Sequence, residues 1–406
     1  MVDARIIIDS QSNPLFLGSE YEQAYDQRGG LCHGKMGDLV VTTKPYDPAY
    51  LSYWESLGFE MPELLVVGNG NASTPLSTDV LRSERALSHI WSHCRGGERR
   101  VEFFVVEEPE VNLGKRLSVK VYSNLELARH YGSKPEFRRL AEEIGLPLVE
   151  GGIFHSFDAA KRFIESTIKS GEKVLIKSER GTGGEKLTSL AILSDVAAFD
   201  DAIGRISHLG YEFLVEKLIP DPRVEVSLHW EIDFDGTHRF LGIYDQLVES
   251  HSYIGAGYPS SLDSETEAVL VRRLHNQLIP KLKSLGYVGY GCVDVNVQPE
   301  EHWMDFNPRK GAIRYIDDAV KRLFAKHQPF FWHTSFKVGH PTSIESIQQI
   351  LGPMLNKDEE RGWMVLATNP GLYPFGTVDL TGISLRSREE ARERFEDARE
   401  RLLNAV

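Results

Sequence analysis

The sequence predicts an α/β fold made of more than one domain. In the first 128 residues, short runs rich in β-branched and apolar residues alternate with polar or helical connections, which is typical of parallel α/β units. The length of 406 residues exceeds what one hydrophobic core usually organises, so about two to three domains are expected. The shares of hydrophobic residues (41%) and charged residues (26%) are those of an ordinary soluble globular protein.

Charge and cysteine usage exclude several classes of protein. With 46 basic and 59 acidic side chains the formal net charge is −13, and coating nucleic acid would need a net basic face. No stretch is long and apolar enough to span a membrane, and the short run Ile6–Ile8 lies between charges, so no signal peptide is expected. Three widely spaced cysteines without a CxxC pair indicate reduced thiols, a cytoplasmic location and no structural zinc site.

The first predicted domain covers residues 1–128. Its expected strands are the runs 38–42, 64–67, 101–106 and 117–121. Gly68-Asn69-Gly70 follows one of them, at the position where a dinucleotide-binding turn would approach a phosphate. Because the full GxGxxG spacing and a suitable acidic residue are missing, a plain turn is favoured and a Rossmann oxidoreductase is a poor alternative.

The second predicted domain covers residues 129–325. Ser133 to Glu136 has the pattern of a capping box at the start of a helix, and Gly145 ends that helix. The pattern then predicts helices over 156–170 and 264–285, strands over 174–177, 213–219, 224–233 and 238–249, and a loop over 251–263. An antiparallel hairpin is expected from 293–297 and 302–306, closed by a turn over 298–301.

Residues 326–406 are predicted to form a C-terminal extension. Five prolines between residues 329 and 374 interrupt its pattern. A last helix is expected to start at Ser387, with Glu390 completing a capping box. Its alternating Arg and Glu residues indicate a solvated face, opposite the apolar stripe Ala391, Phe395, Ala398 and Leu402.

The first chemical signal is a lysine before a glycine loop. Lys177 closes a buried strand shortly before Gly181-Thr182-Gly183-Gly184, and glycine backbone N–H groups with a lysine ammonium can hold phosphates. Taken alone, the pattern is equally typical of a surface lysine and a flexible turn. The Walker sequence GxxxxGK[ST] is absent, so a P-loop fold is not expected.

The second signal is Asp294 followed by Asp305-Phe306-Asn307-Pro308-Arg309. On a hairpin, Asp305 and Asn307 share a face, and the partner strand can bring Asp294 beside them. Mg²⁺ suits such a set, because it prefers a few carboxylates plus substrate phosphates. Arg309 comes next on that face, where a guanidinium could grip a carboxylate or a phosphoryl group. The alternative is a pair of solvent-facing aspartates on an edge hairpin.

Taken together, the segments between Lys134 and Arg309 resemble an ATP-grasp domain. The matching segments, in order, are Ser133-Lys134 with its helix and Gly145-Leu146-Pro147, 174–177 with the glycine loop, 215–219, 224–227, 286–289 leading to Asp294, and 305–309. The flanking regions are similar to the peptide ligases of the pheganomycin type, which carry a pre-ATP-grasp domain and a distinct C-terminal region. The resemblance implies a pre-ATP-grasp α/β domain (1–128), an α+β grasp core with subdomains 129–215 and 216–325, and the extension.

The resemblance also implies roles for individual residues. Lys134 and Lys177 would hold the α- and β-phosphates of ATP. The other implied ATP contacts are Gly181, Thr182, Gly183 and Gly184 over the β- and γ-phosphates, Glu216 with the backbone of Lys217 and Ile219 at the adenine edge, and Glu225 at the ribose. Asp294, Asp305 and Asn307 would bind Mg²⁺, usually as two ions, with Mn²⁺ as a substitute.

Two departures from the family pattern concern catalysis. Many of these ligases have Glu where Asp305 stands, and several have an arginine where this chain has Cys292. The transition state would therefore be stabilised by one or more of Arg309, Lys186 and Arg314. Tyr253 and Tyr258 lie in the predicted loop and could wall a substrate site, although a loop ordered by its own tyrosines is nearly as good an interpretation.

The implied reaction is ATP-dependent formation of an amide. A carboxylate would become an acyl phosphate, and an amine would displace the phosphate, with amino acids or short peptides as substrates and no nucleic-acid or membrane partner. A homodimer is possible within this interpretation. The alternatives are another ATP-grasp branch, carboxylase-like or in nucleotide metabolism, and a module that binds ATP without turnover.

Overall fold

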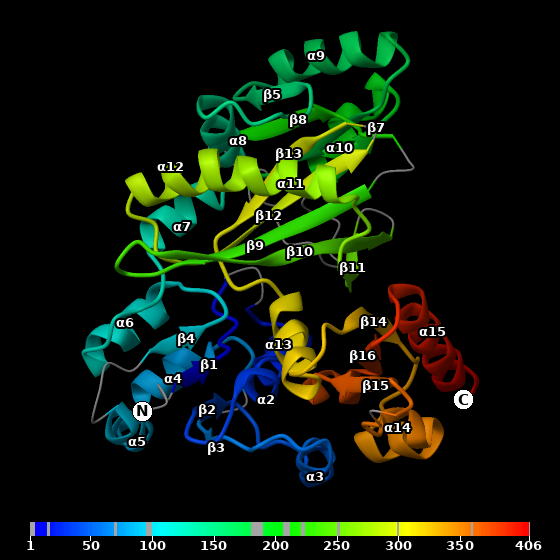
Figure 1. Cartoon of the computed structure of the whole chain (residues 1–406). Coiled ribbons are helices and arrows are strands. Elements are labelled where there is room, and N and C mark those ends of the chain that lie inside the picture. The colour runs from blue at the N-terminus through cyan, green and yellow to red at the C-terminus, as the bar shows by residue number, and fades with distance from the viewer. Residues whose placement is uncertain are drawn as a thin grey trace. The chain divides into compact units, whose positions relative to one another are not determined.

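The computed structural model describes residues 5–13, 17–68, 71–94, 100–179, 190–205, 212–220, 224–249, 252–298, 300–358 and 360–405. The chain divides into two compact units, whose elements Figure 1 labels. Unit 1 comprises Met1–Leu125, Ile254–Pro259 and Arg309–Val406, and unit 2 comprises Glu126–Tyr253 and Ser260–Pro308. The predicted division into three domains stays a prediction, because compact units need not coincide with domains.

Unit 1 begins with a parallel sheet in the order β3-β2-β1-β4. Its strands are β1 (Ile6–Ile8), β2 (Leu39–Thr42), β3 (Glu63–Val66) and β4 (Val101–Phe103). The connecting helices are α1 (Glu20–Gln23), η2 (Ala24–Gln27), α2 (Gly30–His33), α3 (Pro48–Ser56), α4 (Leu76–Arg82), α5 (Glu84–Cys94) and α6 (Glu108–Leu117). Apolar residues of β1, β2, α4, α5 and α6 share one core. This confirms a parallel α/β arrangement.

The rest of unit 1 is built on antiparallel strands. β16 (Thr377–Ser384) pairs with β14 (Phe330–Lys337) on one side and β15 (Trp363–Thr368) on the other, and β14 also pairs with the end of β11 (Ser252–Tyr258). The helices here are α13 (Ile313–Leu323), α14 (Ile344–Leu351), η5 (Gly352–Leu355), η6 (Pro370–Phe375) and α15 (Arg388–Asn404). The C-terminal region therefore has more regular structure than its prolines indicate, while the predicted last helix and its buried stripe are confirmed.

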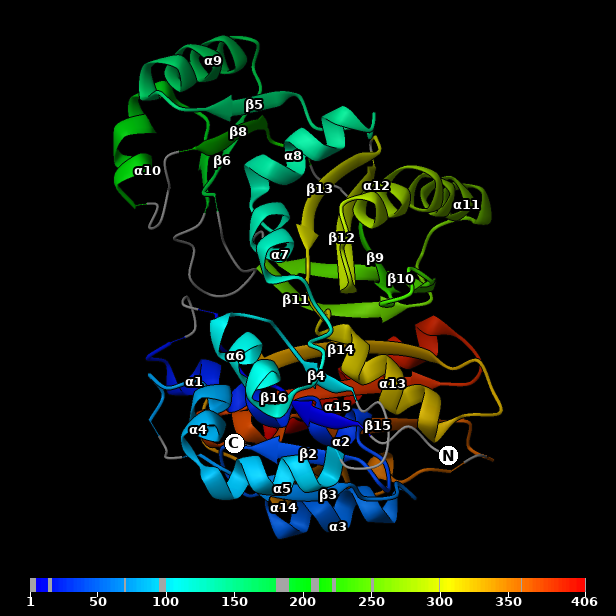
Figure 2. The same ribbon diagram turned by 90° about the vertical axis from the view of Figure 1, so that its left-hand side faces the viewer.

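Unit 2 contains a four-stranded antiparallel sheet in the order β5-β8-β6-β7. Its strands are β5 (Gly151–Phe154), β6 (Val174–Lys177), β7 (Leu190–Leu193) and β8 (Phe213–Lys217). Figure 2 shows α9 (Phe157–Lys169) and α10 (Phe199–Arg205) beside this sheet. The short helix η3 (Val196–Ala198) directly precedes α10. Ile164, Phe199 and Val215 belong to the core that joins these helices to the sheet.

The second sheet of unit 2 has the strand order β13-β12-β9-β10. It is formed by β9 (Val224–Ile232), β10 (His238–Glu249), β12 (Gly289–Gln298) and β13 (His302–Asn307). The helices of this part are α7 (Leu125–Tyr131), α8 (Lys134–Glu143), α11 (Ser264–Arg273), η4 (Leu274–Leu278) and α12 (Ile279–Ser284). One large core unites Phe137 of α8, Leu274 of η4 and Trp230 of the sheet.

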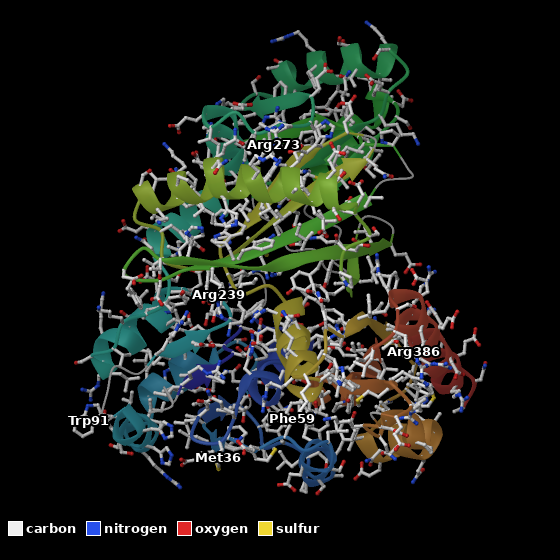
Figure 3. The ribbon with its side chains drawn as sticks, in the orientation of Figure 1. Met36, Phe59, Trp91, Arg239, Arg273 and Arg386 are labelled. Atoms are coloured by element: carbon white, nitrogen blue, oxygen red, sulfur yellow. The ribbon has the colours of Figure 1, made fainter. Side chains whose placement is uncertain are left out.

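Two side chains contact the Glu301 carboxylate, which lies next to strand β13 of the hairpin in unit 2. The Nε of Arg273 lies 2.9 Å from Oε1 of Glu301, and Figure 3 labels this arginine at the end of α11. The indole N–H of Trp303 donates to the same carboxylate, at 2.7 Å. The antiparallel pairing of β12 with β13 confirms the predicted hairpin strands, while residue 299 of the predicted turn lies outside the described residues. The ion pair ties Glu301 to the end of α11.

Three local predictions were wrong. The predicted strand 117–121 instead starts at the end of α6, where Ser118 adopts a left-handed conformation, and Val121 forms only an isolated bridge with Val101. The predicted loop 251–263 contains β11, because Gly255 lets the backbone approach β14: a Cβ there would lie 2.0 Å from the carbonyl oxygen of His333. Ser133 precedes α8 without a side-chain cap, so the predicted capping box is absent.

The long helix predicted over 264–285 is interrupted by the π-helical turn η4. Pro280 lies just beyond this turn and has no N–H for the usual i→i−4 hydrogen bond, so a widened turn can accommodate it. Among the described residues, no helix is both long and apolar enough for a membrane span.

Candidate active site

The site in unit 2 is centred on a buried ion pair between Lys177 and Glu216. Lys177 ends β6 and Glu216 stands on the neighbouring strand β8, with Nζ and Oε2 2.9 Å apart. The exposed fraction is 6% for Lys177 and 5% for Glu216. Burial lowers the pKa of Lys177, but Asp305 and Glu216 outweigh this effect and raise its pKa above the ordinary lysine value. Lys177 is therefore held protonated inside the protein.

Arg138 of α8 completes the environment of Glu216. Its Nη1 donates to Oε1 of Glu216 at 2.8 Å, and its Nη2 donates to the carbonyl oxygens of Val149 and Gly151. Both carboxylate oxygens of Glu216 therefore already have cationic partners. The sequence analysis missed Arg138, although it stands four residues after Lys134 and so on the same side of the helix.

A second lysine converges on the same place. The Nζ of Lys134, at the start of α8, lies 3.5 Å from Oδ2 of Asp305, and the Nζ of Lys177 lies 3.9 Å from Oδ1. Burial raises the pKa of Asp305, whereas Lys134 and Lys177 lower it more, so the pKa lies below the ordinary aspartate value. Two cations from separate elements thus face one ionised carboxylate.

Asp294 lies directly opposite Asp305 in the β12–β13 hairpin. The carboxylate of Asp294 accepts hydrogen bonds from Nδ2 of Asn307 at 3.1 Å, from the hydroxyl of Ser227 at 3.0 Å and from the side-chain amide of Gln246. The predicted neighbourhood of Asp294, Asp305 and Asn307 is therefore present, and Ser227 and Gln246 join it from β9 and β10. No sequence pattern indicates these two residues, because their positions follow from strand pairing.

The donor set of this hairpin suits a divalent cation. Oδ1 of Asp305 is buried and has no hydrogen-bond donor in the described parts of the chain, so an acceptor is left unused. Within those parts, no group of three or more His, Cys, Asp or Glu side chains is arranged to hold a metal. Two carboxylates and one amide oxygen are few protein ligands, which is the usual situation for Mg²⁺ that also binds substrate phosphates.

The remaining predicted ATP contacts of unit 2 lie near this centre or along β8 and β9. Glu225 stands on β9 opposite Asn296 and is among the carboxylates that raise the pKa of Lys177. The ammonium of Lys217 pairs with Glu150 and Glu172, and its backbone N–H donates to the carbonyl oxygen of Glu150. The N–H of Lys217 is thus already used within the protein, and Ile219 lies two residues beyond the end of β8.

Other predicted residues belong to unit 1 or fall outside the described chain. The guanidinium carbon of Arg309 lies 5.2 Å from the ring centroid of Phe104. Arg314 pairs with Asp317 and Asp318. Tyr258 stacks on Phe331 within unit 1, whereas Tyr253 is the last residue of the first segment of unit 2. The residues outside the described ranges are Gly181, Thr182, Gly183, Gly184 and Lys186.

Comparison with known proteins agrees with this architecture. Residues 27–119 match the family model described as the pre-ATP-grasp domain. Nearly the whole chain superposes on solved ATP-grasp structures. The chain has the ATP-grasp fold. No curated protein matches the sequence.

Three of the similar ATP-grasp structures illustrate the extent of the likeness. N5-carboxyaminoimidazole synthetase from Staphylococcus aureus, in complex with ADP, is 13% identical, with a TM-score of 0.58 over 98% of this chain and 97% of that chain. The biotin carboxylase domain of 2-oxoglutarate carboxylase from Hydrogenobacter thermophilus is 13% identical, with a TM-score of 0.59 over 98% and 89%. Biotin carboxylase from Campylobacter jejuni is 14% identical, with a TM-score of 0.59 over 99% and 94%. At these identities the ATP-grasp likeness establishes the fold.

Proposed function

We propose that this protein is an ATP-dependent ligase that joins a carboxylate to an amine. The observation that carries the proposal is the convergence of Lys134 and Lys177 on Asp305, with Asp294 directly opposite. Cations that face acidic residues on a sheet can hold the phosphates of a nucleotide while the carboxylates hold its metal. The ATP-grasp fold and the match to the pre-ATP-grasp domain support the same assignment.

Each residue of the centre has a role in this proposal. Lys134 and Lys177 donate to phosphate oxygens of ATP, and Glu216, itself held by Arg138, orients Lys177. Asp294, Asp305 and Asn307 hold Mg²⁺, which supplies neutralisation of the phosphate charge when bound. Further proposed ATP contacts are Gly181 to Gly184, the backbone around Lys217 and Ile219, and Glu225.

The proposed reaction needs no protein nucleophile. A carboxylate oxygen of the substrate attacks the γ-phosphorus, the bond from that phosphorus to the β-phosphate oxygen breaks, and ADP leaves. The amine then attacks the acyl carbon, phosphate leaves, and the nitrogen loses a proton to give an amide. The protein positions the substrates and supplies charged groups that stabilise the transition state. Arg309, Lys186 and Arg314 are the candidates that stabilise the transferred phosphoryl group.

The finer features of the function are proposed with it. The substrates are an amino acid or a short peptide on each side of the new bond, as in the pheganomycin-type ligases, and Tyr253 and Tyr258 are candidate substrate contacts. Mg²⁺ is the proposed metal, usually as two ions, and Mn²⁺ can substitute for it. A cytoplasmic location and a homodimer complete the proposal.

A carboxylase-like reaction is the second candidate. The similar biotin carboxylase domain from Hydrogenobacter thermophilus was crystallised with MgADP, ADP and bicarbonate. In this alternative, bicarbonate takes the place of the organic carboxylate, while the ATP and metal residues keep their roles. The two candidates differ in the acid that is activated, so a single assay can distinguish them.

The decisive experiment incubates the protein with ATP, Mg²⁺ and a matrix of amino acids, with and without bicarbonate, and identifies all products by mass. ADP that forms only when a carboxylate and an amine are both present, together with an amide of the two, is the expected result. ADP that requires bicarbonate instead favours the carboxylase-like reaction.

Two outcomes contradict both candidates. AMP with pyrophosphate would show an adenylating mechanism. ATP that binds without any turnover across the matrix would indicate a nucleotide-binding module.

A further inference from the structure

Arg28 in unit 1 is enclosed by aromatic rings and has no anionic partner among the residues that the structure describes. Its guanidinium carbon lies 4.5 Å from the ring centroid of Phe104, 4.9 Å from that of Tyr25 and 5.0 Å from that of Tyr315. Its Nε and Nη2 are buried, and within the described ranges neither donates a hydrogen bond. No carboxylate oxygen of those ranges lies within 4.0 Å of this guanidinium.

This situation is unusual for a partly buried arginine. A guanidinium stays protonated in proteins and carries five N–H donors, so buried donors without acceptors are unfavourable. Aromatic faces compensate the charge in part, but they accept no ordinary hydrogen bond. Two other arginines of unit 1 have carboxylate partners: Arg5 pairs with Asp38, and Arg314 pairs with Asp317. The Arg28 side chain is therefore missing an acceptor that the described chain does not supply.

The rings around Arg28 lie where open α/β sheets bind ligands. Phe104 follows the carboxyl end of β4, and Asp9 follows that of β1, its parallel neighbour. In the order β3-β2-β1-β4, the chain proceeds to one side of β1 and then returns to the other, so the topological switch point lies between β1 and β4. Ligands of such sheets bind beyond the carboxyl ends of the strands at this point.

The walls of the site are fixed within unit 1. The hydroxyl of Tyr315 donates to Oδ1 of Asp9 at 3.0 Å, and Asp9 is only 2% exposed. The next residue after Arg28 is Gly29, where a Cβ would lie 2.0 Å from both Oδ2 of Asp9 and Cε1 of Tyr315. This close packing holds the Tyr315 ring against the Arg28 guanidinium. An anion would thus meet a preorganised cation.

A second guanidinium lies against the same aromatic ring. The guanidinium carbon of Arg309 is 5.2 Å from the Phe104 centroid, so Phe104 carries both Arg28 and Arg309. Two guanidinium groups near one ring make the electrostatic potential around Phe104 more positive. This favours a negatively charged ligand over a neutral one.

We propose that Arg28, with Arg309 and the rings of Tyr25, Phe104 and Tyr315, binds an oxyanion of the amine-bearing substrate. This oxyanion is a carboxylate or phosphate group that is not itself activated, and a planar guanidinium suits either. The assignment to the amine substrate rests on the proposed ligase function, whereas binding of the oxyanion does not. Arg28 would thus set which amines are accepted.

The first test measures binding without ATP. Thermal unfolding of the full chain is followed as sodium acetate or inorganic phosphate is titrated at constant ionic strength, with chloride as the reference. One of the two anions is expected to raise the melting temperature of the wild type. In Arg28→Gln, the anion concentration that gives half of this effect should be about tenfold higher. Arg116→Gln is the matched control, since Arg116 is an exposed arginine of unit 1 paired with Glu84.

The outcomes separate the two ligand sources. A response to acetate identifies a carboxylate, and a response to phosphate identifies a phosphorylated substrate. Equal responses in the wild type and Arg28→Gln, or no response to either anion, would overturn the proposal. If Arg28→Gln does not fold, Arg28→Lys, which keeps the charge and loses the fork of donors, replaces it with the same expected direction.

The second test separates this proposal from the ligase function. Asp305→Asn is expected to lose turnover and keep the oxyanion response, because Asp305 belongs to unit 2 and Arg28 to unit 1. Once the amine is known, Arg28→Lys should raise its KM about tenfold while the KM for ATP stays unchanged. An equal rise of both KM values would indicate a structural role for Arg28 and contradict the proposal.

Discussion

The ammonium of Lys177 lies 2.9 Å from Oε2 of Glu216, and both side chains are buried. A buried cation of this kind needs a permanent partner, because desolvation otherwise favours the neutral amine. Glu216 fills that role through Oε2, and Arg138 binds the other carboxylate oxygen, Oε1. Lys177 can therefore face Asp305 or a phosphate without losing its charge.

Replacement of Lys177 by Met should weaken ATP binding about 100-fold, since one charge-assisted contact is lost. It should also destabilise the protein by up to about 3–5 kcal/mol, with Arg138 limiting the loss by retaining Glu216. Urea unfolding and nucleotide titration measure the two effects. Lys217→Met is the matched control: its ammonium pairs with Glu150 and Glu172 at the surface, so a much smaller stability change is expected. Unchanged ATP affinity in Lys177→Met would contradict the proposed phosphate contact.

Asp305→Asn and Asp294→Asn should each reduce turnover about 1,000-fold and raise the Mg²⁺ concentration needed for half-maximal ADP release. The fold should persist, because asparagine keeps the shape of aspartate. ADP release as Mg²⁺ is titrated, with circular dichroism of each variant, tests this expectation. Asp263→Asn is the control, since Asp263 caps α11 and asparagine is an equally good cap. A normal Mg²⁺ dependence in Asp305→Asn would remove Asp305 from the metal site.

Glu102 should make unit 1 sensitive to acid. Burial raises the pKa of Glu102, but Lys310 and then Arg5 lower it far more, and the Lys310 ammonium lies 2.8 Å from its Oε2. Because the folded-state pKa lies below the unfolded value of about 4.3, the contribution of Glu102 is fully present above that pH and is lost as the pH falls through the folded value.

Unfolding measured between neutral and acidic pH should thus show a steep loss of wild-type stability below about pH 4. Glu102→Gln should be about 3–5 kcal/mol less stable at neutral pH, because Lys310 stays buried without its partner, and its stability should vary less with acid. The double variant Glu102→Leu with Lys310→Met, which removes both charges, should recover much of the loss. An identical acid profile in the wild type and Glu102→Gln would contradict this account.

Gly291 should tolerate no side chain. It stands on β12 beneath the stacked rings of Trp230 and Phe306, and a Cβ there would lie 2.8 Å from Cζ2 of Trp230 and 3.0 Å from Cε2 of Phe306. Gly291→Ala should destabilise the protein by about 1–3 kcal/mol through this overpacking.

Gly204→Ala should instead raise the free energy of unfolding, as measured by chemical denaturation of both variants. Nothing lies within 4 Å of a Cβ at Gly204, which is part of helix α10, so alanine should stabilise by about 0.5–1 kcal/mol. A Gly291→Ala variant that is as stable as the wild type, or more stable, would show that the packing argument for Gly291 is incorrect.

Local patterns and the order of segments were sufficient to predict much of this molecule. The strand that ends at Lys177, the helix that begins at Lys134 and the hairpin with Asp294 opposite Asp305 are present as predicted. Each depends on interactions between residues close in sequence, or on strand periodicity, which the amino-acid order displays directly. The resemblance to ATP-grasp domains, carried by segments in a fixed order, was confirmed at the level of the fold.

The tertiary structure decided which side chains meet. Arg138 reaches Glu216 across 78 positions, Ser227 reaches Asp294 across 67, and Tyr315 reaches Asp9 across 306. No local pattern encodes such contacts, because they follow from the path of the backbone and from strand pairing. That no described residue accepts a hydrogen bond from the buried Nε and Nη2 of Arg28 is likewise a result of packing, since only the folded chain shows which acceptors come within reach of a buried donor.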